Sequence, residues 1–336
     1  MKRFLIKISY TVLPLWILTV GLVVFYYTAI VPNMQGDLGV LGKIPSKFFY
    51  ESPKDSSMIS YWVDNIEIKD ANIVCSVDIA TCGDSFSQQG LYGYQNYMVR
   101  NGFRMGNFPS SDNPFQTAAS LLVNNDIDTS KVRILIIETV ERSLVDRLLE
   151  LDLSKKEYAL HKKNDGAIIS ENRLIETKNY IFFKFGWEQE NPVKEFSLKE
   201  SMFSGSHGNE LYVYYEDLEN AMNIPQGQES AFREKVNSLF EKAKEKGIHL
   251  IILVCPDKYD MYQEYILEKK LPHKTINEDF RKIVGSNENI IIAKEILMPY
   301  IKNGIKDMYH LDDTHWSYKS ARIVADTLSS LCKNIR

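Results

Sequence analysis

Short apolar runs alternate with amphipathic stretches along this chain. Residues 132–137 and 248–254 are mostly apolar and rich in β-branched side chains, which is typical of parallel strands buried on both faces, and 290–293 is a weaker run of the same kind. Residues 231–246 place apolar side chains at helical spacing among many charges, which predicts an amphipathic helix. This alternation of strands and helices favours a doubly wound, parallel α/β sheet.

Two short polar strings lie beside further predicted elements. The apolar stretch 73–77 predicts a buried strand, and Gly83-Asp84-Ser85-Phe86 follows it. Asp313-Thr314-His315-Trp316 directly precedes residues 317–334, where apolar side chains recur at helical spacing. Reactive groups of an open α/β sheet gather beyond the carboxyl ends of its strands, so we expect both strings at one edge of the sheet.

The two strings together contain the parts of a hydrolase-type triad. Ser85 is the candidate nucleophile, His315 the candidate base, and a nearby aspartate the acid that holds the base in the required tautomer. The structural alternative is a strand-to-helix turn, in which Gly83 supplies backbone freedom and Ser85 caps a helix. Finding both strings in these contexts favours the catalytic interpretation.

At these residues the chain resembles a known family. Gly83-Asp84-Ser85-Phe86 resembles the nucleophile block of the SGNH (GDSL-type) hydrolases, and Asp313-Thr314-His315-Trp316 resembles a segment of their alginate O-acetyltransferase branch, the AlgX/AlgJ-like proteins. Segments 113–116, 138–142 and 256–259 are similar to the same branch. The resemblance implies a three-layer α/β/α fold and an enzyme that moves acetyl groups onto polysaccharide hydroxyls through an acyl-serine. It implies Ser85 as the nucleophile, His315 as the base and Asp313 as the partner of the base.

Two features depart from the family pattern. In the alginate enzymes the Asp-x-His segment precedes the serine, whereas here it follows, as in the esterases of the superfamily. Those esterases use Asp-x-x-His, which selects Asp312 in place of Asp313, although the Thr-His-Trp context favours Asp313. The esterases also complete their oxyanion hole with an asparagine that residues 136–142 lack. The backbone N–H groups of Ser85 and Gly106 are the predicted donors, and the third donor is left open.

Three more side chains are candidates for substrate contacts. Arg142 follows a predicted strand and can bind an anionic sugar or steady the oxyanion, or form an ion pair that fixes its loop. Lys258 also follows a strand and can line the acceptor site or pack through its stem. Trp316 adjoins the base, and we expect it to stack on a sugar ring, with loop packing as the alternative.

The N-terminus predicts a membrane anchor. No charged residue lies between Lys7 and Asp37, and residues 10–31 are almost wholly apolar. A helix over this range would span about 33 Å, enough for a hydrocarbon core of about 30 Å. Three basic residues precede the span, so the positive-inside rule keeps residues 1–9 in the cytoplasm and exports the rest. A cleaved signal peptide is the alternative.

The remaining chain divides into a connector and a catalytic domain. Residues 32–70 contain three prolines and little periodicity, which indicates a connector, and residues 71–336 form the expected SGNH-like domain, with a polar, lysine-rich insertion at about 151–205. The net charge of −4 gives no support to a nucleic-acid partner. The four cysteines lack metal-ligand spacing, and their disulfide state is open.

These observations combine into one functional prediction. We expect a single-pass protein of the cytoplasmic (inner) membrane whose extracytoplasmic (periplasmic) domain is an O-acetyltransferase of envelope or exported polysaccharide. The resemblance implies a membrane-bound O-acyltransferase as acetyl supplier, and no metal or organic cofactor is expected. A carbohydrate O-acetyl esterase and a catalytically idle scaffold or glycan-binding protein are the alternatives. The triad alone does not separate transfer from hydrolysis, because the acceptor depends on how the crevice holds sugar and excludes water.

Overall fold

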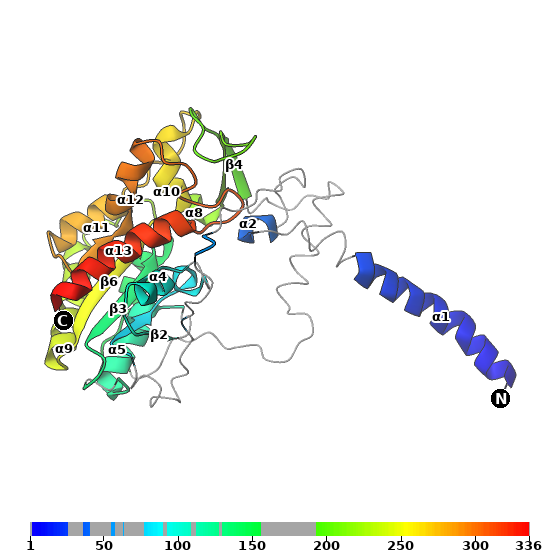
Figure 1. The fold of residues 1–336 in the computed structure, drawn as a ribbon, viewed down its shortest axis with the longest axis horizontal. Coiled ribbons are helices and arrows are strands. Elements are labelled where there is room, and N and C mark those ends of the chain that lie inside the picture. The colour runs from blue at the N-terminus through cyan, green and yellow to red at the C-terminus, as the bar shows by residue number, and fades with distance from the viewer. Residues whose placement is uncertain are drawn as a thin grey trace.

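A five-stranded sheet forms the centre of the molecule (Figure 1). The computed structural model describes residues 2–25, 36–40, 55–57, 63, 77–89, 93–108, 112–127, 130–155 and 193–335. Along the sheet the strand order is β2–β1–β3–β6–β7, and every pairing is parallel. In chain order these strands are β1 (Ile79–Cys82), β2 (Met105–Phe108), β3 (Ile134–Val140), β6 (His249–Cys255) and β7 (Ile290–Ile292). The predicted parallel α/β sheet is therefore confirmed.

The long central strands are buried on both faces because their side chains alternate between two apolar cores. In β3, Ile134 and Ile136 belong to one core, whereas Leu135 and Ile137 belong to the other. All of β3 is buried, including Glu138 near its carboxyl end. A buried carboxyl group requires hydrogen-bond partners, so this end of the strand has to be part of a polar network.

Helices cover both faces of the sheet. The helices α4 (Tyr94–Arg100), α12 (Ala293–Lys302) and α13 (Tyr318–Ile335) pack on one core. The other core is covered by α5 (Pro114–Asn124), α6 (Leu144–Glu150), α9 (Glu229–Glu245) and α11 (Ile276–Val284). In Figure 1, α13 lies beside α4, which it contacts. The result is an arrangement of three layers, helices, sheet and helices, as predicted.

The direction in which the chain crosses the sheet reverses between β1 and β3. From β1 the chain crosses to β2 on one side, and the next strand, β3, pairs on the other side of β1. Connections that diverge from neighbouring strands leave a crevice beyond the carboxyl ends of those strands, where ligands of open α/β sheets bind. The loop after β1 carries Ser85, and the loop after β3 carries Arg142.

Smaller elements surround this edge. They are α2 (Asp37–Val40), η4 (Ser85–Gln88), η6 (Glu141–Ser143), α8 (Glu216–Glu219), α10 (Lys258–Tyr262) and η7 (Gln263–Tyr265). A separate antiparallel pair consists of β4 (Val193–Ser197) and β5 (Glu210–Tyr214). The strand β4 lies in the predicted insertion, of which residues 156–192 fall outside the described residues.

The elements differ from the predicted ones at several points. Of the strand predicted at 73–77, residues 73–76 lie outside the described residues, and Val77 precedes β1, which begins at Ile79. The strand β2 was not predicted, since its sequence Met-Gly-Asn-Phe contains no apolar run. The predicted elements at 132–137, 248–254, 290–293, 231–246 and 317–334 correspond to β3, β6, β7, α9 and α13.

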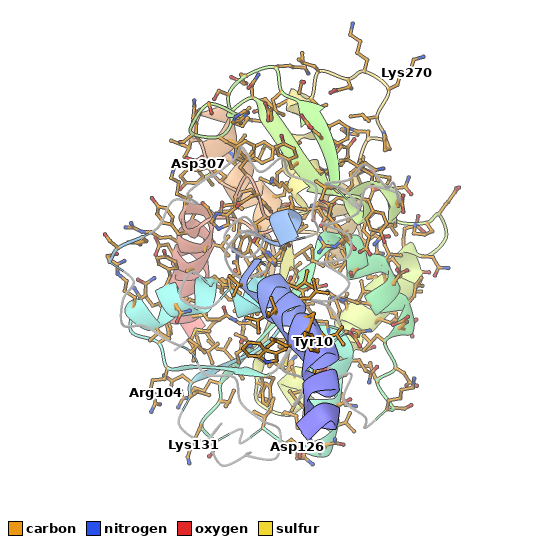
Figure 2. The ribbon with its side chains drawn as sticks, turned by 90° about the vertical axis from the view of Figure 1, so that its right-hand side faces the viewer. Tyr10, Arg104, Asp126, Lys131, Lys270 and Asp307 are labelled. Atoms are coloured by element: carbon orange, nitrogen blue, oxygen red, sulfur yellow. The ribbon has the colours of Figure 1, made fainter. Side chains whose placement is uncertain are left out.

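The N-terminal helix α1 covers Lys2–Phe25. The apolar side chains described within it are exposed, among them Trp16 and Tyr10, the latter 78% exposed (Tyr10 is labelled in Figure 2). None of the helices in the described ranges is both long enough and apolar enough to cross a membrane. The predicted span 10–31 extends beyond α1 into residues 26–31, which lie outside the described residues. Of the predicted connector, the structure describes only residues 36–40, 55–57 and 63.

Candidate active site

The loop after β1 is tied down by Asp84. One carboxylate oxygen of Asp84 accepts a hydrogen bond from the backbone N–H of Phe86 (3.2 Å), which caps η4. The other accepts from the N–H of Val140 (2.8 Å) and pairs with Arg147 of α6 at 2.6 Å. Burial raises the pKa of Asp84, but the charge of Arg147 and the hydrogen bonds to Asp84 together outweigh burial and hold the pKa below its ordinary value. Asp84 is therefore a charged structural anchor, which leaves the adjacent Ser85 as the candidate nucleophile.

Glu138, at the end of β3, supports the same loop. Its Oε2 accepts hydrogen bonds from Asp84 N (3.0 Å), Ser87 N (3.1 Å) and Ser87 Oγ (2.7 Å). A Cβ added at Gly83 would lie 2.5 Å from this oxygen, so only glycine fits there. Burial, followed by the charge of Asp84, raises the pKa of Glu138 well above its ordinary value, which favours the protonated form of the group.

The two serines of this loop have different surroundings. Ser87 is 7% exposed, and its hydroxyl donates to Glu138 and also contacts the Tyr94 hydroxyl at 3.2 Å. Ser85 is partly exposed at the first position of η4. Because a nucleophile must reach its substrate, Ser85 and not Ser87 has the exposure that the chemistry requires.

The second string forms an acid–base pair. Oδ1 of Asp313 lies 2.6 Å from Nδ1 of His315 and also accepts from the backbone N–H of that histidine at 2.9 Å. An ionised carboxylate can only accept, so Nδ1 carries the proton and Nε2 presents its lone pair. Nε2 is buried and has no hydrogen-bond partner within the described ranges. This pair has the tautomer that a general base needs.

Asp313, and not Asp312, contacts the base. Asp312 is buried, and its backbone carbonyl accepts from Leu38 N at 3.1 Å. Burial raises the pKa of Asp312 to about 6. For Asp313, the hydrogen bonds from His315 and the charge of His315 together outweigh burial and hold its pKa well below the ordinary range. Burial lowers the pKa of His315, but the hydrogen bond and charge of Asp313 and the charge of Asp37 outweigh it, so the net shift is upward.

The loops that carry the predicted nucleophile and base pack against each other. The ring of Phe86, the residue after Ser85, lies 4.8 Å from the His315 ring and 4.8 Å from the Trp316 ring between centroids. Gln89 Nε2 also donates to the Trp316 carbonyl at 3.0 Å. His315 Nε2 has no hydrogen-bond partner among the described residues, so the hydrogen bond from Ser85 Oγ that a triad requires is not formed in this structure. Catalytic hydrogen bonds commonly tighten only when substrate binds.

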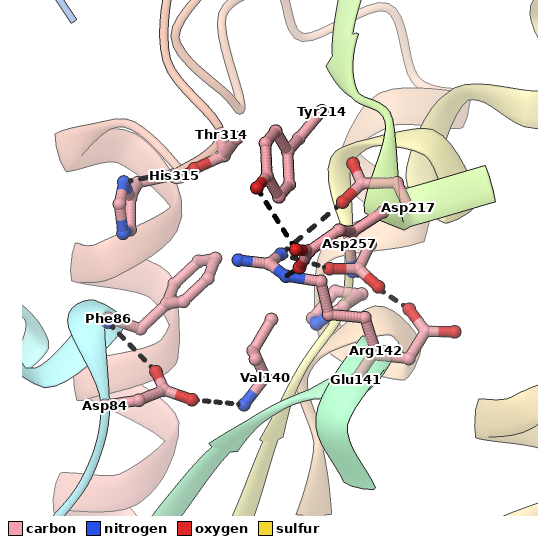
Figure 3. A network of polar contacts seen from close by, with 12 residues as sticks. Asp84, Phe86, Val140, Glu141, Arg142, Tyr214, Asp217, Asp257, Thr314 and His315 are labelled. Atoms are coloured by element: carbon pink, nitrogen blue, oxygen red, sulfur yellow. Dashed lines mark hydrogen bonds and ion pairs between the residues drawn. The ribbon is translucent and has the colours of Figure 1, made fainter. Parts of the chain in front are cut away.

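Arg142 lies on the opposite side of Phe86 from His315 (Figure 3). Its Nη1 pairs with Asp257 at 2.6 Å and Asp217 at 3.4 Å, and Asp257 also pairs with the buried Lys274 at 2.6 Å. Burial lowers the pKa of Arg142, but Asp257 and Asp217 outweigh it and keep the guanidinium charged. Nη2 makes no hydrogen bond to any described residue. The structure thus shows the predicted ion pair and leaves one guanidinium nitrogen for an anionic group.

Three other predicted residues lie where they have little access to a substrate. Lys258 is fully buried, and its Nζ donates to the carbonyls of Leu311 (2.8 Å) and Asp313 (3.1 Å), so it holds the acid–base loop. Burial lowers the pKa of this lysine to about 8. Trp316 is also fully buried, which corresponds to loop packing and not to sugar stacking. Gly106 lies within β2 opposite Ala80, before the edge that Gly83 reaches.

Asp37, Asp313 and His315 each offer a ligand atom, and these atoms lie within 4.8 Å of one another. The 2.6 Å between Nδ1 of His315 and Oδ1 of Asp313 is a hydrogen-bond distance. Two ligands of one zinc ion, each about 2.1 Å from the metal at a tetrahedral angle, would lie about 3.4 Å apart. The three groups therefore fit a hydrogen-bonded acid–base pair with a second carboxylate better than a metal centre.

Sequence reasoning missed two parts of this site. The contacts of Asp37 with the loop at 313–315 join residues more than 270 positions apart, and nothing in the local sequence around Asp37 indicates them. The pairing of Asp84 with Arg147 was also missed. A signal for Glu138 was present, since a carboxyl group within a buried strand must be satisfied close to the strand's end.

Comparison with known proteins gives two matches. Residues 211–335 match the sequence model of the family described as the SGNH hydrolase-like domain of the acetyltransferase AlgX. The chain is 31% identical over 127 residues to a "Probable alginate O-acetylase AlgJ" from Pseudomonas fluorescens, an alignment that covers 36% of this chain and 32% of that protein. The chain thus spans about a third of the length of the curated relative it matches. No solved structure matches.

The family match confirms the resemblance for the C-terminal part of the domain. It includes Lys258, Asp313, His315 and Trp316, whereas Ser85 and Arg142 lie before it. The acid–base pair therefore lies in the matched region, and the nucleophile is assigned from its own motif and position.

Proposed function

Since residues 211–335 carry an SGNH hydrolase-like domain of the AlgX/AlgJ-like branch, we propose that this protein is an O-acetyltransferase that modifies polysaccharide hydroxyls through an acetyl-Ser85 intermediate. The observation that carries the proposal is the Asp313–His315 pair, which leaves Nε2 unpartnered among the described residues and packs against the residue next to Ser85. A scaffold protein would have no need of a base held in this tautomer.

In the first half-reaction, Nε2 of His315 takes the hydroxyl proton of Ser85 as its oxygen attacks the acetyl carbonyl of a donor ester. The developing oxyanion is stabilised by the backbone N–H of Ser85 and by Nη2 of Arg142. The bond from the acetyl carbon to the donor oxygen then breaks, and His315 returns the proton to the leaving alcohol. Asp313 stabilises the imidazolium that exists between these steps.

In the second half-reaction, a sugar hydroxyl replaces the donor alcohol. His315 takes its proton, the sugar oxygen attacks the acetyl-serine carbonyl, and Ser85 leaves as the proton returns to it. If water enters in place of the sugar, the product is acetate. Esterase activity is therefore the second candidate function, and the order of serine before Asp-x-His, as in the esterases, favours it.

We place the enzyme outside the cytoplasm, held at the inner membrane by its N-terminus and supplied with acetyl groups by a membrane-bound O-acyltransferase. This part of the proposal rests on the uncharged sequence between Lys7 and Asp37 and on the basic residues that precede it. The polysaccharide acceptor rests on the name of the AlgJ relative. Fusions of reporters at residue 40 test the location, because only an exported reporter should be active.

Acetyl transfer can be separated from hydrolysis with the full-length protein and an activated acetyl ester. We expect oligosaccharides to accept acetyl groups faster than free acetate appears, and Ser85→Ala to abolish both products. Acetate release that no sugar alters, together with deacetylation of acetylated glycans, would establish the esterase instead. Loss of neither product in Ser85→Ala would contradict the assignment of the nucleophile.

A further inference from the structure

We propose that Asp37, from the segment that precedes the catalytic domain, is a positioning residue of the active site, because it holds the loop of Asp313 and His315 and places a second carboxylate beside the base. The catalytic role of Asp37 rests on the proposed function, in which His315 is the base. The geometry that supports the inference is independent of any reaction.

Asp37 binds the acid–base loop through both its side chain and its backbone. Oδ1 of Asp37 accepts from the N–H of Thr314 at 2.7 Å, and Oδ2 accepts from the hydroxyl of the same threonine. In return, the backbone N–H of Asp37 donates to Oδ2 of Asp313 at 3.2 Å. Asp313 thus receives a hydrogen bond from Asp37 on one oxygen and from His315 on the other. Such reciprocal bonding fixes the orientation of the carboxylate that orients the base.

The neighbours of Asp37 show that this contact is closely fitted. Leu38 N donates to the carbonyl of Asp312 at 3.1 Å, and the Leu38 side chain is fully buried in the core. Gly36 adopts a φ of +73°, and a Cβ there would overlap the carbonyl of Asp312. Any other residue at position 36 would be strained and would push the segment away. Three consecutive residues are therefore adapted to the loop at 312–314.

Burial and the charge of Asp313 raise the pKa of Asp37, whereas the charge of His315 lowers it, so the charges of Asp37 and His315 stabilise each other. Oδ2 of Asp37 lies 3.6 Å from Nδ1 of His315, so the imidazolium formed during catalysis faces two carboxylates. The other charged or titratable groups that act on this loop are Asp312, Asp313, Arg142, Lys258 and His310. Arg142 opposes protonation of His315, whereas Asp37 and Asp313 favour it. Removal of the Asp37 charge should therefore make His315 a weaker base.

The test uses Asp37→Asn in the full chain. The amide oxygen can still accept from Thr314 N–H, so this variant removes the charge while keeping the main hydrogen bond. We expect the pKa of His315, followed by NMR of its ring nitrogens, to fall by at least about one unit, the shift that a charge at this distance produces even when it is screened as in bulk water. The acid limb of the kcat profile for acetyl-ester turnover should move to lower pH by the same amount.

Two further variants separate positioning from simple stability. Gly36→Ala keeps the carboxylate but displaces it, and we expect the His315 pKa to fall and kcat to drop about tenfold. Glu278→Gln, a partly exposed carboxylate of α11, is the matched control and should change neither quantity. An unchanged His315 pKa in both Asp37→Asn and Gly36→Ala would overturn the inference, whatever the activity.

The same measurements keep the inference distinct from the proposed function. A shifted His315 pKa in a protein that turns over no acetyl ester would support the role of Asp37 and contradict the acetyltransferase proposal. If turnover depends on Ser85 but the pKa of His315 does not change in the Asp37 variant, the acetyltransferase proposal is supported and the role of Asp37 is contradicted.

Discussion

Replacement of Glu138 by alanine removes the acceptor that three donors of the Ser85 loop share. These donors are Asp84 N, Ser87 N and Ser87 Oγ, at 2.7 to 3.1 Å from Glu138 Oε2. A buried donor left without a partner costs about 1–3 kcal/mol. Because water can enter the space that alanine opens and satisfy some of them, we expect the free energy of unfolding to fall by about 3 kcal/mol. The loop should also shift, with kcat at least tenfold lower.

Glu138→Gln is the matched variant. Burial, with the charge of Asp84, raises the pKa of Glu138 well above its ordinary value and so favours its protonated form, whose shape and acceptor oxygen a glutamine nearly reproduces. The stability that protonated Glu138 contributes is complete below its unfolded pKa and is lost as pH rises through its higher folded pKa. Glu138→Gln should therefore become more stable relative to the natural protein as pH increases above about 4.5.

Urea unfolding at several pH values and the rate of acetyl-ester turnover test both variants. We expect Glu138→Ala to fall far below the natural protein in both stability and turnover rate. Glu138→Gln should match the stability of the natural protein within about 1 kcal/mol below about pH 4.5 and exceed it at neutral pH. If glutamine were as damaging as alanine, Glu138 would act as a charged group, and the reasoning on its protonation would be wrong. An alanine variant with unchanged stability would show that the three hydrogen bonds carry no net energy.

Three further predictions concern the remaining candidates. Asp313→Asn should lower kcat by about 10³- to 10⁴-fold because the base loses its tautomer, whereas Asp312→Asn should change it by less than about tenfold, and steady-state kinetics of both variants decide between the two aspartates. Arg142→Lys should lower kcat about 10²-fold with little change in the donor KM, since a lysine amine does not reproduce the position of Nη2. Trp316→Ala should lower the free energy of unfolding by about 4 kcal/mol, while Trp316→Phe leaves the acceptor KM within about twofold, and a tenfold rise in that KM would restore the sugar-stacking interpretation.

The sequence predicted the strands β3 and β6 almost in place, because a strand buried on both faces shows a continuous apolar run. It predicted neither β1 at Ile79–Cys82 nor β2, because the burial of these two strands depends on their neighbours. Thr81 and Asn107, for example, are buried polar residues whose side chains bond to each other across the two strands at 2.6 Å. No local window of sequence contains such a pairing.

In the site, too, the residues marked by a local motif could be predicted, whereas those placed by contacts between distant segments could not. Ser85 and His315 could be identified from their motifs, since nucleophile and base require particular residue types in particular surroundings. The choice between Asp312 and Asp313 depended on loop geometry, and Asp37 on a contact between distant segments. Tryptophan is a residue type that often stacks on sugar rings, but Trp316 is fully buried and packs against Phe86. The residue type alone does not reveal this burial.

The central claim is that Ser85 carries the acetyl group. The full-length protein is mixed with an activated acetyl ester in the absence of an acceptor, quenched in acid within seconds, and its peptides are mapped by mass spectrometry. A mass increase of one acetyl group, located on Ser85, absent from Ser85→Ala and greatly reduced in His315→Gln, is the predicted result. An acetyl group located on Ser87, or an adduct that persists in Ser85→Ala, would contradict the account.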